Sequence, residues 1–366
     1  MHEPALAAAT ARARAVADGL LFPKAQTTDR ASLVPRENLD ALRDAGLFGL
    51  HAPVDVPGGL GAGHAEARPI LEAIAGGCGA TAFVWAQHHG AVRRIAGSEG
   101  PARARWLPRL SDGSTLAGIG FAYLRRPGSS AVKATRIDDG WRIDGEAPWI
   151  TGWGLIEALV VMARAGDGSV VTVVVDQPSR DPSLHAGEAQ ALAVMASTGT
   201  VAVAFDGSRV ADADVVGVQE EAAWRHRDRQ GAALPPAAPL GIADRAIRLL
   251  DGRSSGEGVA QATSRFAHEL EVRRTQADAV ARRVAAASGP GGDAVDAAVR
   301  AGAAERDRGL DLSRRATDAL VAASGGGAMS LEHPAQRLAR EATFYLIQAQ
   351  TGELRAVSLA RMAGEG

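Results

Sequence analysis

Residues 325–361 read GGGAMSLEHPAQRLAREATFYLIQAQTGELRAVSLAR. After the three glycines and Pro334, this stretch has an amphipathic helical pattern that is interrupted near Thr351. Arg337 and Arg340 are three residues apart, so on a helix they share one face and could bind a phosphate or a carboxylate. The glycines would let a backbone approach such a ligand closely. The alternative is a loop followed by a surface helix with solvated arginines, and the stretch alone favours that alternative.

The composition of the chain limits the classes of protein to consider. Its 366 residues carry a net charge of −2, which gives no electrostatic reason to expect binding to nucleic acid or to an anionic membrane. No apolar run is long enough to span a bilayer, and the N-terminal residues lack the pattern of a signal peptide. The single cysteine, Cys78, excludes an intrachain disulfide and a cysteine-based metal site. We therefore expect a cytoplasmic protein without nucleic-acid or membrane partners.

The hydrophobic period changes twice along the chain, which divides it into three parts. Residues 1–115 have helical periodicity, residues 116–225 contain short Val-rich runs separated by turn residues, and residues 226–366 return to long helical patterns. The middle part predicts an antiparallel β-barrel or sandwich, because no helical pattern separates most of its strands. The expected fold is therefore α+β, with an N-terminal helical domain, a middle β-domain and a C-terminal helical bundle.

Local signals place several helices within this outline. In the first part, a helix is expected over residues 35–46, where proline comes early and glycine late, and another from about Thr81. In the last part, the helical pattern returns at about Pro235, and a long helix is expected to end before Pro290.

This order of elements, with several motifs, resembles the acyl-CoA dehydrogenase superfamily of flavoproteins. The resemblance covers nearly the whole chain, although each motif taken singly has low specificity. The segments that carry it are residues 41–63, 97–113, 127–130, 141–145 and 149–151, and Gly325, Gly326, Pro334, Arg337, Arg340 and Thr351 at the family's spacings. The resemblance implies a flavin cofactor, but a shared fold does not by itself give the function.

The Trp149-Ile150-Thr151 motif is the strongest signal for a flavin site. A flavin ring is flat and largely apolar with hydrogen-bonding atoms on its edges, so it needs an apolar wall and a few placed donors. The resemblance implies that Trp149 lies against the ring and that the Thr151 hydroxyl reaches its edge. The alternative is a tryptophan at the end of a strand in the core.

A second group of residues is implied in cofactor binding by the resemblance alone. Arg125 and Arg126 stand where the family usually has Thr-Glu, and a cation there could stabilise a reduced anionic flavin or attract a substrate carboxylate. The alternative is that both arginines point to solvent. The implied cofactor contacts are Phe121, Tyr123, Leu124, Arg125, Ser129, Ser130, Gly325, Gly326 and Thr351.

The identity of the flavin and the oligomeric state are also only implied. FAD is the usual cofactor of the family, but the family's Arg-x-x-Phe-Gly segment has no match here and its glutamine before the glycine pair is Ala322. FMN or a loosely bound reduced flavin are therefore alternatives. Family members are usually dimers or tetramers, so a homodimer or homotetramer is expected.

The position of the family's catalytic base holds no carboxylate. Dehydrogenation of a thioester needs a base to remove an α-proton, and losing a positioned base costs on the order of 10²–10⁴ in rate. The residue at the family's glutamate position is Ala349, and the alternative position used by some subfamilies falls near Gly231. Glu353, one helical turn beyond, could be a relocated base, but a solvated helix carboxylate is the favoured interpretation.

These observations predict a flavin-dependent oxygenase that acts on a CoA thioester or a small natural-product-like substrate, with reduced flavin supplied by a partner flavin reductase or by oxidation of the substrate. Such enzymes need a dry cavity rather than a carboxylate base. His88 and His89 are the candidate catalytic residues, of which at most one can point into the cavity, and Trp85 and Ala349 are expected to line the substrate pocket. A dehydrogenase with a relocated base and an inactive homologue that serves as an assembly subunit are the alternatives.

Overall fold

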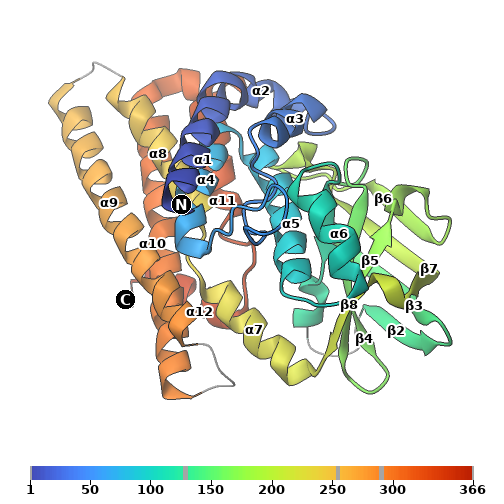
Figure 1. The fold of residues 1–366 in the computed structure, drawn as a ribbon. Helices are drawn as coiled ribbons and strands as arrows, with labels where there is room; N and C mark the ends of the chain where they lie inside the picture. The colour runs from blue at the N-terminus through green and yellow to red at the C-terminus, as the bar shows by residue number, and fades with distance from the viewer. Residues whose placement is uncertain (1, 127–130, 253–255, 288–291, 365–366) are drawn as a thin grey trace.

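A computed structural model describes residues 2–126, 131–252, 256–287 and 292–364. Helices from the N-terminal part lie in the middle of the molecule, with the β-domain on one side and the C-terminal helices on the other (Figure 1). This arrangement confirms the expected α+β fold class. Within the described residues, no helix is both long and apolar enough to cross a lipid bilayer.

The N-terminal part is helical, as its periodicity predicts. Its helices are α1 (His2–Val16), a π-helical turn η1 (Ala17–Leu21), α2 (Phe22–Arg30), α3 (Arg36–Asp44), α4 (His64–Gly77), α5 (Gly79–Ala96) and α6 (Pro101–Ser111). Pro35 is the N-cap of α3, as expected from its fixed backbone angle. The most buried of these helices is α5, which packs on α4, on α6 and on the first strand of the β-domain.

The middle part is a single mixed sheet. Its strands are β1 (Ala117–Gly120), β2 (Val132–Ile137), β3 (Gly140–Ile150), β4 (Ala158–Ala165), β5 (Val170–Asp176), β6 (Leu184–Ala189), β7 (Val201–Ala211) and β8 (Val215–Gln219). The strand order is β6-β7-β3-β2-β4-β5-β8, and β1 also pairs with β4.

The expectation of a wholly antiparallel β-domain is wrong at one strand. β4 pairs in parallel with both β1 and β2, while the other pairings are antiparallel. The reason is the path of the chain: β3 runs back along one edge of β2, and residues 151–157 then return the chain so that β4 runs along the other edge in the direction of β2. Apolar run length predicts strands, but it does not specify their direction.

The C-terminal part contains α7 (Glu221–Ala233), α8 (Ala237–Asp251), α9 (Gly256–Ala286), α10 (Asp293–Ser324), α11 (Pro334–Phe344) and α12 (Gly352–Met362). α7 begins before Pro235, where the helical pattern was expected to return, and it spans the expected boundary at residue 225. Its sequence is mostly charged and polar, so it lacks the apolar stripe that predicts a helix. Its few buried residues include Trp224 and Asp228.

Two glycines set the distance between α4 and α8. A Cβ atom built on Gly241 of α8 would lie 2.1 Å from the carbonyl oxygen of Glu72, and one built on Gly76 of α4 would lie 2.6 Å from the carbonyl oxygen of Gly241. Both clashes are with backbone, which cannot move aside as a flexible side chain does. The two helices therefore pack with their backbones in contact.

Neither Arg337 nor Arg340 is free to bind a ligand, so the hypothesis of an anion site on these two residues is wrong. Arg337 is fully buried and donates to both carboxylate oxygens of Glu341, at 2.7 and 2.9 Å. Arg340 pairs with Asp29 of α2 and donates to the carbonyl oxygen of Ala193. The interpretation as solvated surface arginines is also wrong, because Arg337 is fully buried and Arg340 is paired with Asp29.

Candidate active site

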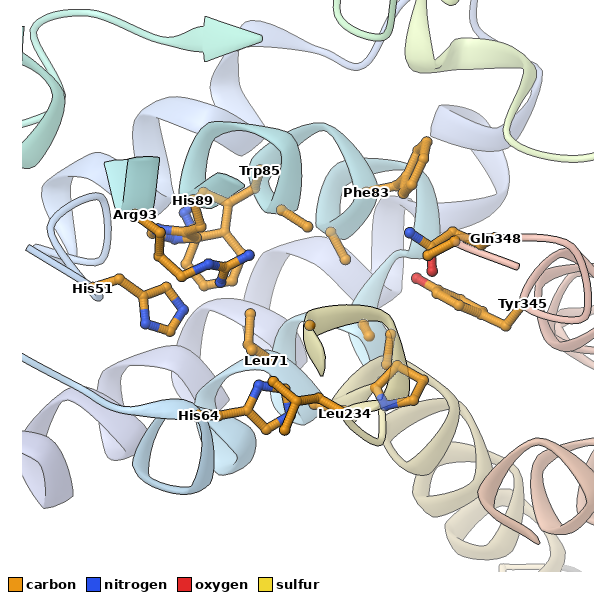
Figure 2. Close-up of a pocket in the computed structure, with 18 of the residues that line it drawn as sticks. His51, His64, Leu71, Phe83, Trp85, His89, Arg93, Leu234, Tyr345 and Gln348 are labelled. Atoms are coloured by element: carbon orange, nitrogen blue, oxygen red, sulfur yellow. The ribbon is translucent and has the colours of Figure 1, made fainter. Parts of the chain in front are cut away.

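A cavity of about 420 Å³ lies between the N-terminal and C-terminal helices. α5 forms one wall with Trp85, His89 and Arg93, and α4 contributes Leu71 (Figure 2). Residues 231–238 at the α7–α8 junction form a second wall, and residues 345–349, which follow α11, form a third. The cavity thus lies where elements from both helical parts meet.

Nitrogen-bearing side chains gather at one end of this cavity, away from Tyr345 and Gln348 (Figure 2). We call this group the polar end; it comprises His51, Trp85, His89 and Arg93. The rings of Trp85 and His89 meet edge to face with 4.3 Å between centroids, and those of His51 and His89 do so at 5.4 Å. Among the described residues, neither ring nitrogen of His89 has a hydrogen-bond partner, and the Trp85 indole nitrogen also lacks one.

The histidines at the cavity are neutral at physiological pH. Burial lowers the pKa of His51 to about 3, and it lowers the pKa of His89 well below its usual range. The pKa of His64, which also lines the cavity, is lowered for the same reason. Since His51 Nδ1 lies 2.7 Å from the carbonyl oxygen of Ala62, it donates there, and the neutral ring presents a lone pair on Nε2.

Arg93 combines access to the cavity with strong desolvation. Its side chain has substantial accessible surface, yet surrounding protein lowers its pKa to about 10. Because Arg93 is one of the residues that line the cavity, its charge is available to a molecule that enters there. In the described part of the chain, no carboxylate forms an ion pair with Arg93.

Arg306 of α10 is a second cation at the cavity. Its side chain is buried, and it donates to the carbonyl oxygen of Gln348 at 2.6 Å. Burial lowers its pKa to about 10, and its Nε has no partner among the described residues. The cavity wall therefore holds two arginines, and none of the described residues that line it is an aspartate or a glutamate.

Of the two candidate catalytic histidines, only His89 lines the cavity. His88 is fully buried, its Nε2 lies 3.2 Å from the carbonyl oxygen of Phe48, and its Nδ1 accepts from the N–H of Ala117 at 3.2 Å. Both of its nitrogens are therefore used in joining α5 to residue 48 and to β1. His88 therefore has a packing role. It does not face the cavity as His89 does, because adjacent residues on a helix point in different directions.

The two expected positions for a catalytic base line the cavity without a carboxylate. Both Ala349 and Gly231 contribute to its wall. Ala349 has a φ of 55°, a left-handed conformation that is uncommon for a residue with a side chain. Glu353 is not among the residues that line the cavity. Both of its carboxylate oxygens accept hydrogen bonds of 2.9 Å from Arg229, and this pairing lowers the pKa of Glu353.

The three residues of the Trp149-Ile150-Thr151 motif lie in different environments. The Trp149 side chain is 49% exposed at the end of β3, so a large aromatic face is open to contact. Thr151 is buried, and its hydroxyl lies 3.0 Å from that of Thr200, which in turn lies 2.9 Å from that of Thr198. Ile150 is fully buried in the core, consistent with strand alternation. An exposed indole next to a hydroxyl network suits one face and edge of a flavin ring.

The residues expected at the pyrimidine side of the flavin are mostly engaged within the protein. Tyr123 is buried, and its hydroxyl donates to the carbonyl oxygen of Met162 at 2.7 Å. Leu124 is a core residue. Arg125 neither points to solvent nor remains free, because it forms two hydrogen bonds of 2.8 Å with Asp228 of α7. Phe121 is half-buried beneath the Arg125 guanidinium.

The remaining predicted cofactor contacts have local explanations or lie outside the described residues. Thr351 is the N-cap of α12 and accepts from the N–H of Leu354 at 3.3 Å. Gly325 has a φ of 60° at the end of α10, which favours glycine, whereas an added Cβ at Gly326 would meet nothing within 4 Å. Ser129 and Ser130 lie outside the described residues.

Four of the residues that line the cavity were not predicted from the sequence: His51, His64, Arg93 and Arg306. His51 and His64 flank a loop, where polar residues are ordinary. Arg93 and Arg94 lie in the last turn of α5, where basic residues are ordinary because they complement the helix dipole. A single sequence does not show that Arg93 faces a cavity.

Comparisons with known proteins agree with this architecture. The model of the acyl-CoA dehydrogenase N-terminal domain matches residues 4–114. The 3-sulfinopropanoyl-CoA desulfinase of Variovorax paradoxus is 29% identical over 164 residues, which are 44% of this chain and 41% of that protein. The (2S)-methylsuccinyl-CoA dehydrogenase of Cereibacter sphaeroides is 25% identical over 60% of this chain and 43% of that protein. The benzylmalonyl-CoA dehydrogenase of Aromatoleum aromaticum is 28% identical over 66% of this chain and 65% of that protein. The chain thus matches less than two thirds of the length of each of these relatives.

Solved structures match over nearly the whole chain. Glutaryl-CoA dehydrogenase from Mycobacterium smegmatis in complex with FADH2 has a TM-score of 0.79 at 17% identity, covering 97% of this chain and 94% of that one. FMN-bound TdsC from Paenibacillus sp. A11-2, a dibenzothiophene monooxygenase, has a TM-score of 0.81 at 19% identity, covering 98% of both chains. These likenesses show the shared fold.

Proposed function

Since this chain belongs to the acyl-CoA dehydrogenase superfamily, we propose that it is a flavin-dependent oxidoreductase acting on a small molecule, with a CoA thioester as the leading substrate class. The curated relatives support this class, because the names of all three specify a CoA thioester. The cavity of about 420 Å³ is large enough for a short acyl group. In keeping with the family, a homodimer or homotetramer is the expected assembly.

Trp149 and Thr151 are the residues that would hold the flavin ring. Trp149 offers an exposed aromatic face, and the Thr151 hydroxyl can exchange its hydrogen bond with Thr200 for one to a ring edge. FAD is the leading cofactor and FMN the alternative, because the solved relatives include one of each kind. The bound flavin would supply two-electron redox chemistry.

We propose oxygenation rather than dehydrogenation as the reaction class. The observation that carries this proposal is the absence of any aspartate or glutamate among the described residues that line the cavity, including positions 231 and 349. An oxygenation takes two electrons from reduced flavin, places one oxygen atom of O₂ in the substrate and releases the other as water. A partner flavin reductase would supply those electrons.

The residues of the cavity would serve this reaction by orienting the substrate and excluding water. Leu71, Phe83 and Leu234 give apolar surface, which favours a dry site. His89 is the candidate for contact with the substrate, because it is buried, neutral and without a hydrogen-bond partner in the described structure. As a neutral imidazole, it can donate or accept one hydrogen bond.

The decisive experiment separates the two reaction classes with the flavin-loaded protein. We expect a saturated acyl-CoA to leave the bound flavin oxidised under anaerobic conditions. Chemically reduced protein, mixed with substrate and ¹⁸O₂, should instead release product that contains ¹⁸O. Anaerobic bleaching of the flavin by the acyl-CoA, with formation of the enoyl-CoA, would reject the oxygenase assignment in favour of a dehydrogenase.

A pair of variants at Ala349 tests the base argument directly. Ala349→Glu introduces a carboxylate at the cavity wall, and we expect it to gain anaerobic reduction by a saturated acyl-CoA. Ala349→Gln has nearly the same size without the charge and should not gain it. Purified protein that takes up neither FAD nor FMN would reject both enzyme assignments and support the alternative of an inactive assembly subunit.

A further inference from the structure

The charges at the cavity are all of one sign. Arg93 and Arg306 line it, the histidines His51, His64 and His89 are neutral, and no described carboxylate contributes to the wall. The remaining titratable group, Tyr345, is neutral because burial raises the pKa of its hydroxyl. A low-dielectric cavity with two cations and no acid favours an anionic occupant.

The two arginines differ in their hydrogen-bond partners. Arg306 is buried and donates to the carbonyl oxygen of Gln348. Arg93 is exposed and lines the cavity, and no hydrogen bond or ion pair joins its guanidinium to another described residue. Because Arg93 is exposed, its charge does not require a partner in the free protein, and the guanidinium is available to an anion that enters the cavity it lines. Arg93 is therefore the group that selects the ligand.

Buried groups beside Arg93 are also without partners. His89 and Trp85 line the cavity, each is at most 1% exposed, and none of their ring nitrogens has a partner among the described residues. The Trp85 N–H and one N–H of the neutral His89 are donors, and unsatisfied donors at buried positions are rare in native proteins. A carboxylate has enough lone pairs to accept from Arg93 and from these donors together.

Resting on the proposed function of this cavity as a substrate site, we propose that the polar end binds a second, anionic group of the substrate, a carboxylate or a sulfinate, and that Arg93 is its main partner. The thioester end of the substrate then lies toward Tyr345 and Gln348, at the opposite side of the cavity (Figure 2). Arg93 is thus a specificity-determining residue for acyl groups that end in an acid.

Succinyl-CoA and butyryl-CoA are the probes for this proposal. Both have a four-carbon acyl chain and the same CoA phosphates, and they differ in a terminal carboxylate against a methyl group. We expect the oxidised flavin-loaded protein to bind succinyl-CoA at least about tenfold more tightly in isothermal titration calorimetry, as is typical of a charge-assisted pair. Free succinate, as a third probe, distinguishes a thioester ligand from a free acid.

Three variants identify the residue responsible. Arg93→Met should abolish the preference for succinyl-CoA, and Arg93→Lys should keep part of it because the charge remains. Arg94→Met is the matched control: Arg94 is the next residue of α5 and does not line the cavity, so the preference should persist. Thermal melting checks that each variant is folded, and Arg93→Met should melt no lower than the wild type, since it breaks no hydrogen bond or ion pair to another described residue.

Each outcome decides the inference separately from the proposed function. A preference for succinyl-CoA that depends on Arg93 supports the inference even if no turnover is found, in which case only the oxygenase proposal fails. Binding of free succinate through Arg93 without binding of either thioester also supports the anion site and rejects the CoA substrate class. Equal affinity for succinyl-CoA and butyryl-CoA, or an equal loss in Arg93→Met and Arg94→Met, overturns the inference.

Discussion

The carboxylate of Glu341 on α11 accepts a hydrogen bond of 3.2 Å from the backbone N–H of Gly79, the first residue of α5. The same carboxylate accepts from Arg337 at 2.7 and 2.9 Å. A carboxylate at the N-terminus of a helix is stabilised by the N–H groups and the dipole there. The C-terminal stretch thus anchors the start of the helix that carries Trp85, His89 and Arg93.

We predict that Glu341→Gln destabilises the protein strongly. The change leaves the Arg337 guanidinium fully buried without an opposite charge, and breaking a buried ion pair in this way typically costs about 3–5 kcal/mol. Urea unfolding at pH 7 measures this loss. Glu37→Gln is the control, because the Lys24–Glu37 pair is exposed and its loss should change the unfolding midpoint little. Equal midpoints for both variants would contradict the anchoring role.

Gly241→Ala should also destabilise the protein, for a steric reason. Its Cβ would lie 2.1 Å from the carbonyl oxygen of Glu72, so α4 and α8 would have to move apart, at a cost of about 1–3 kcal/mol or more. Gly258→Ala on α9 is the matched control, because its Cβ meets no atom within 4 Å and the change should stabilise the helix by about 0.5–1 kcal/mol. Opposite shifts in melting temperature are expected, and shifts of the same sign would argue against close contact between the helices.

The buried histidines predict a loss of stability on acidification. The pKa of His51 is about 3 in the folded protein and about 6.5 in the unfolded chain, so between these values only the unfolded state takes up the proton. Stability from this group is full above pH 6.5 and falls by about 1.4 kcal/mol per pH unit below it.

His51→Asn isolates this contribution, because the asparagine amide can still donate toward the carbonyl oxygen of Ala62. Burial raises the pKa of Glu72 and Glu305, so these two carboxyl groups favour the folded state as the pH falls. Both groups are present in the wild type and in the variant, so their contributions cancel when the two proteins are compared. Urea unfolding between pH 6.5 and 4.5 should show a steeper decline for the wild type. Parallel pH profiles would show that His51 is not neutral in the folded state.

Trp149→Ala should weaken flavin binding without unfolding the protein. The indole is 49% exposed at the end of β3, so its removal leaves no core cavity, while a bound flavin would lose an aromatic wall. We expect about a tenfold increase in the flavin Kd, measured by the change in flavin fluorescence on titration. Trp141→Ala, on the same strand and beside Arg136, is the control and should leave the affinity unchanged. A Kd unaffected by Trp149→Ala would place the flavin elsewhere.

Much of the architecture could be predicted from local patterns. Helical periodicity and proline–glycine placement predict the N-terminal helices, and the Val-rich runs predict β4 and β5. Two predictions were wrong because the sequence pattern carries no signal there. α7 has almost no apolar stripe, and the direction of β4 depends on how residues 151–157 cross the sheet. Packing against α10 supports α7 instead of any strong local preference.

The candidate site could be predicted only in part, because pairing between distant residues decides which polar groups are free. Arg125 and Asp228 are 103 positions apart and Arg340 and Asp29 are 311 apart, so no spacing rule could find either pair. The Arg337–Glu341 pair, four residues apart on one helix, has the spacing of a helical ion pair, but its burial depends on α5 and α2 packing over it.

The sequence by itself determined the division of the chain into a helical, a strand and a second helical part, the motif that resembles a flavin site, and the alanine at the expected position of the base. These are properties of neighbouring residues or of fixed spacings along the chain. The tertiary structure decided that His89 rather than His88 lines the cavity and that Arg93 forms no ion pair with another described residue. It also decided that Arg337 and Arg340 form ion pairs within the protein. The physical reason is that burial and charge pairing arise from contacts between elements far apart in sequence, whereas periodicity records only which face of one element is apolar.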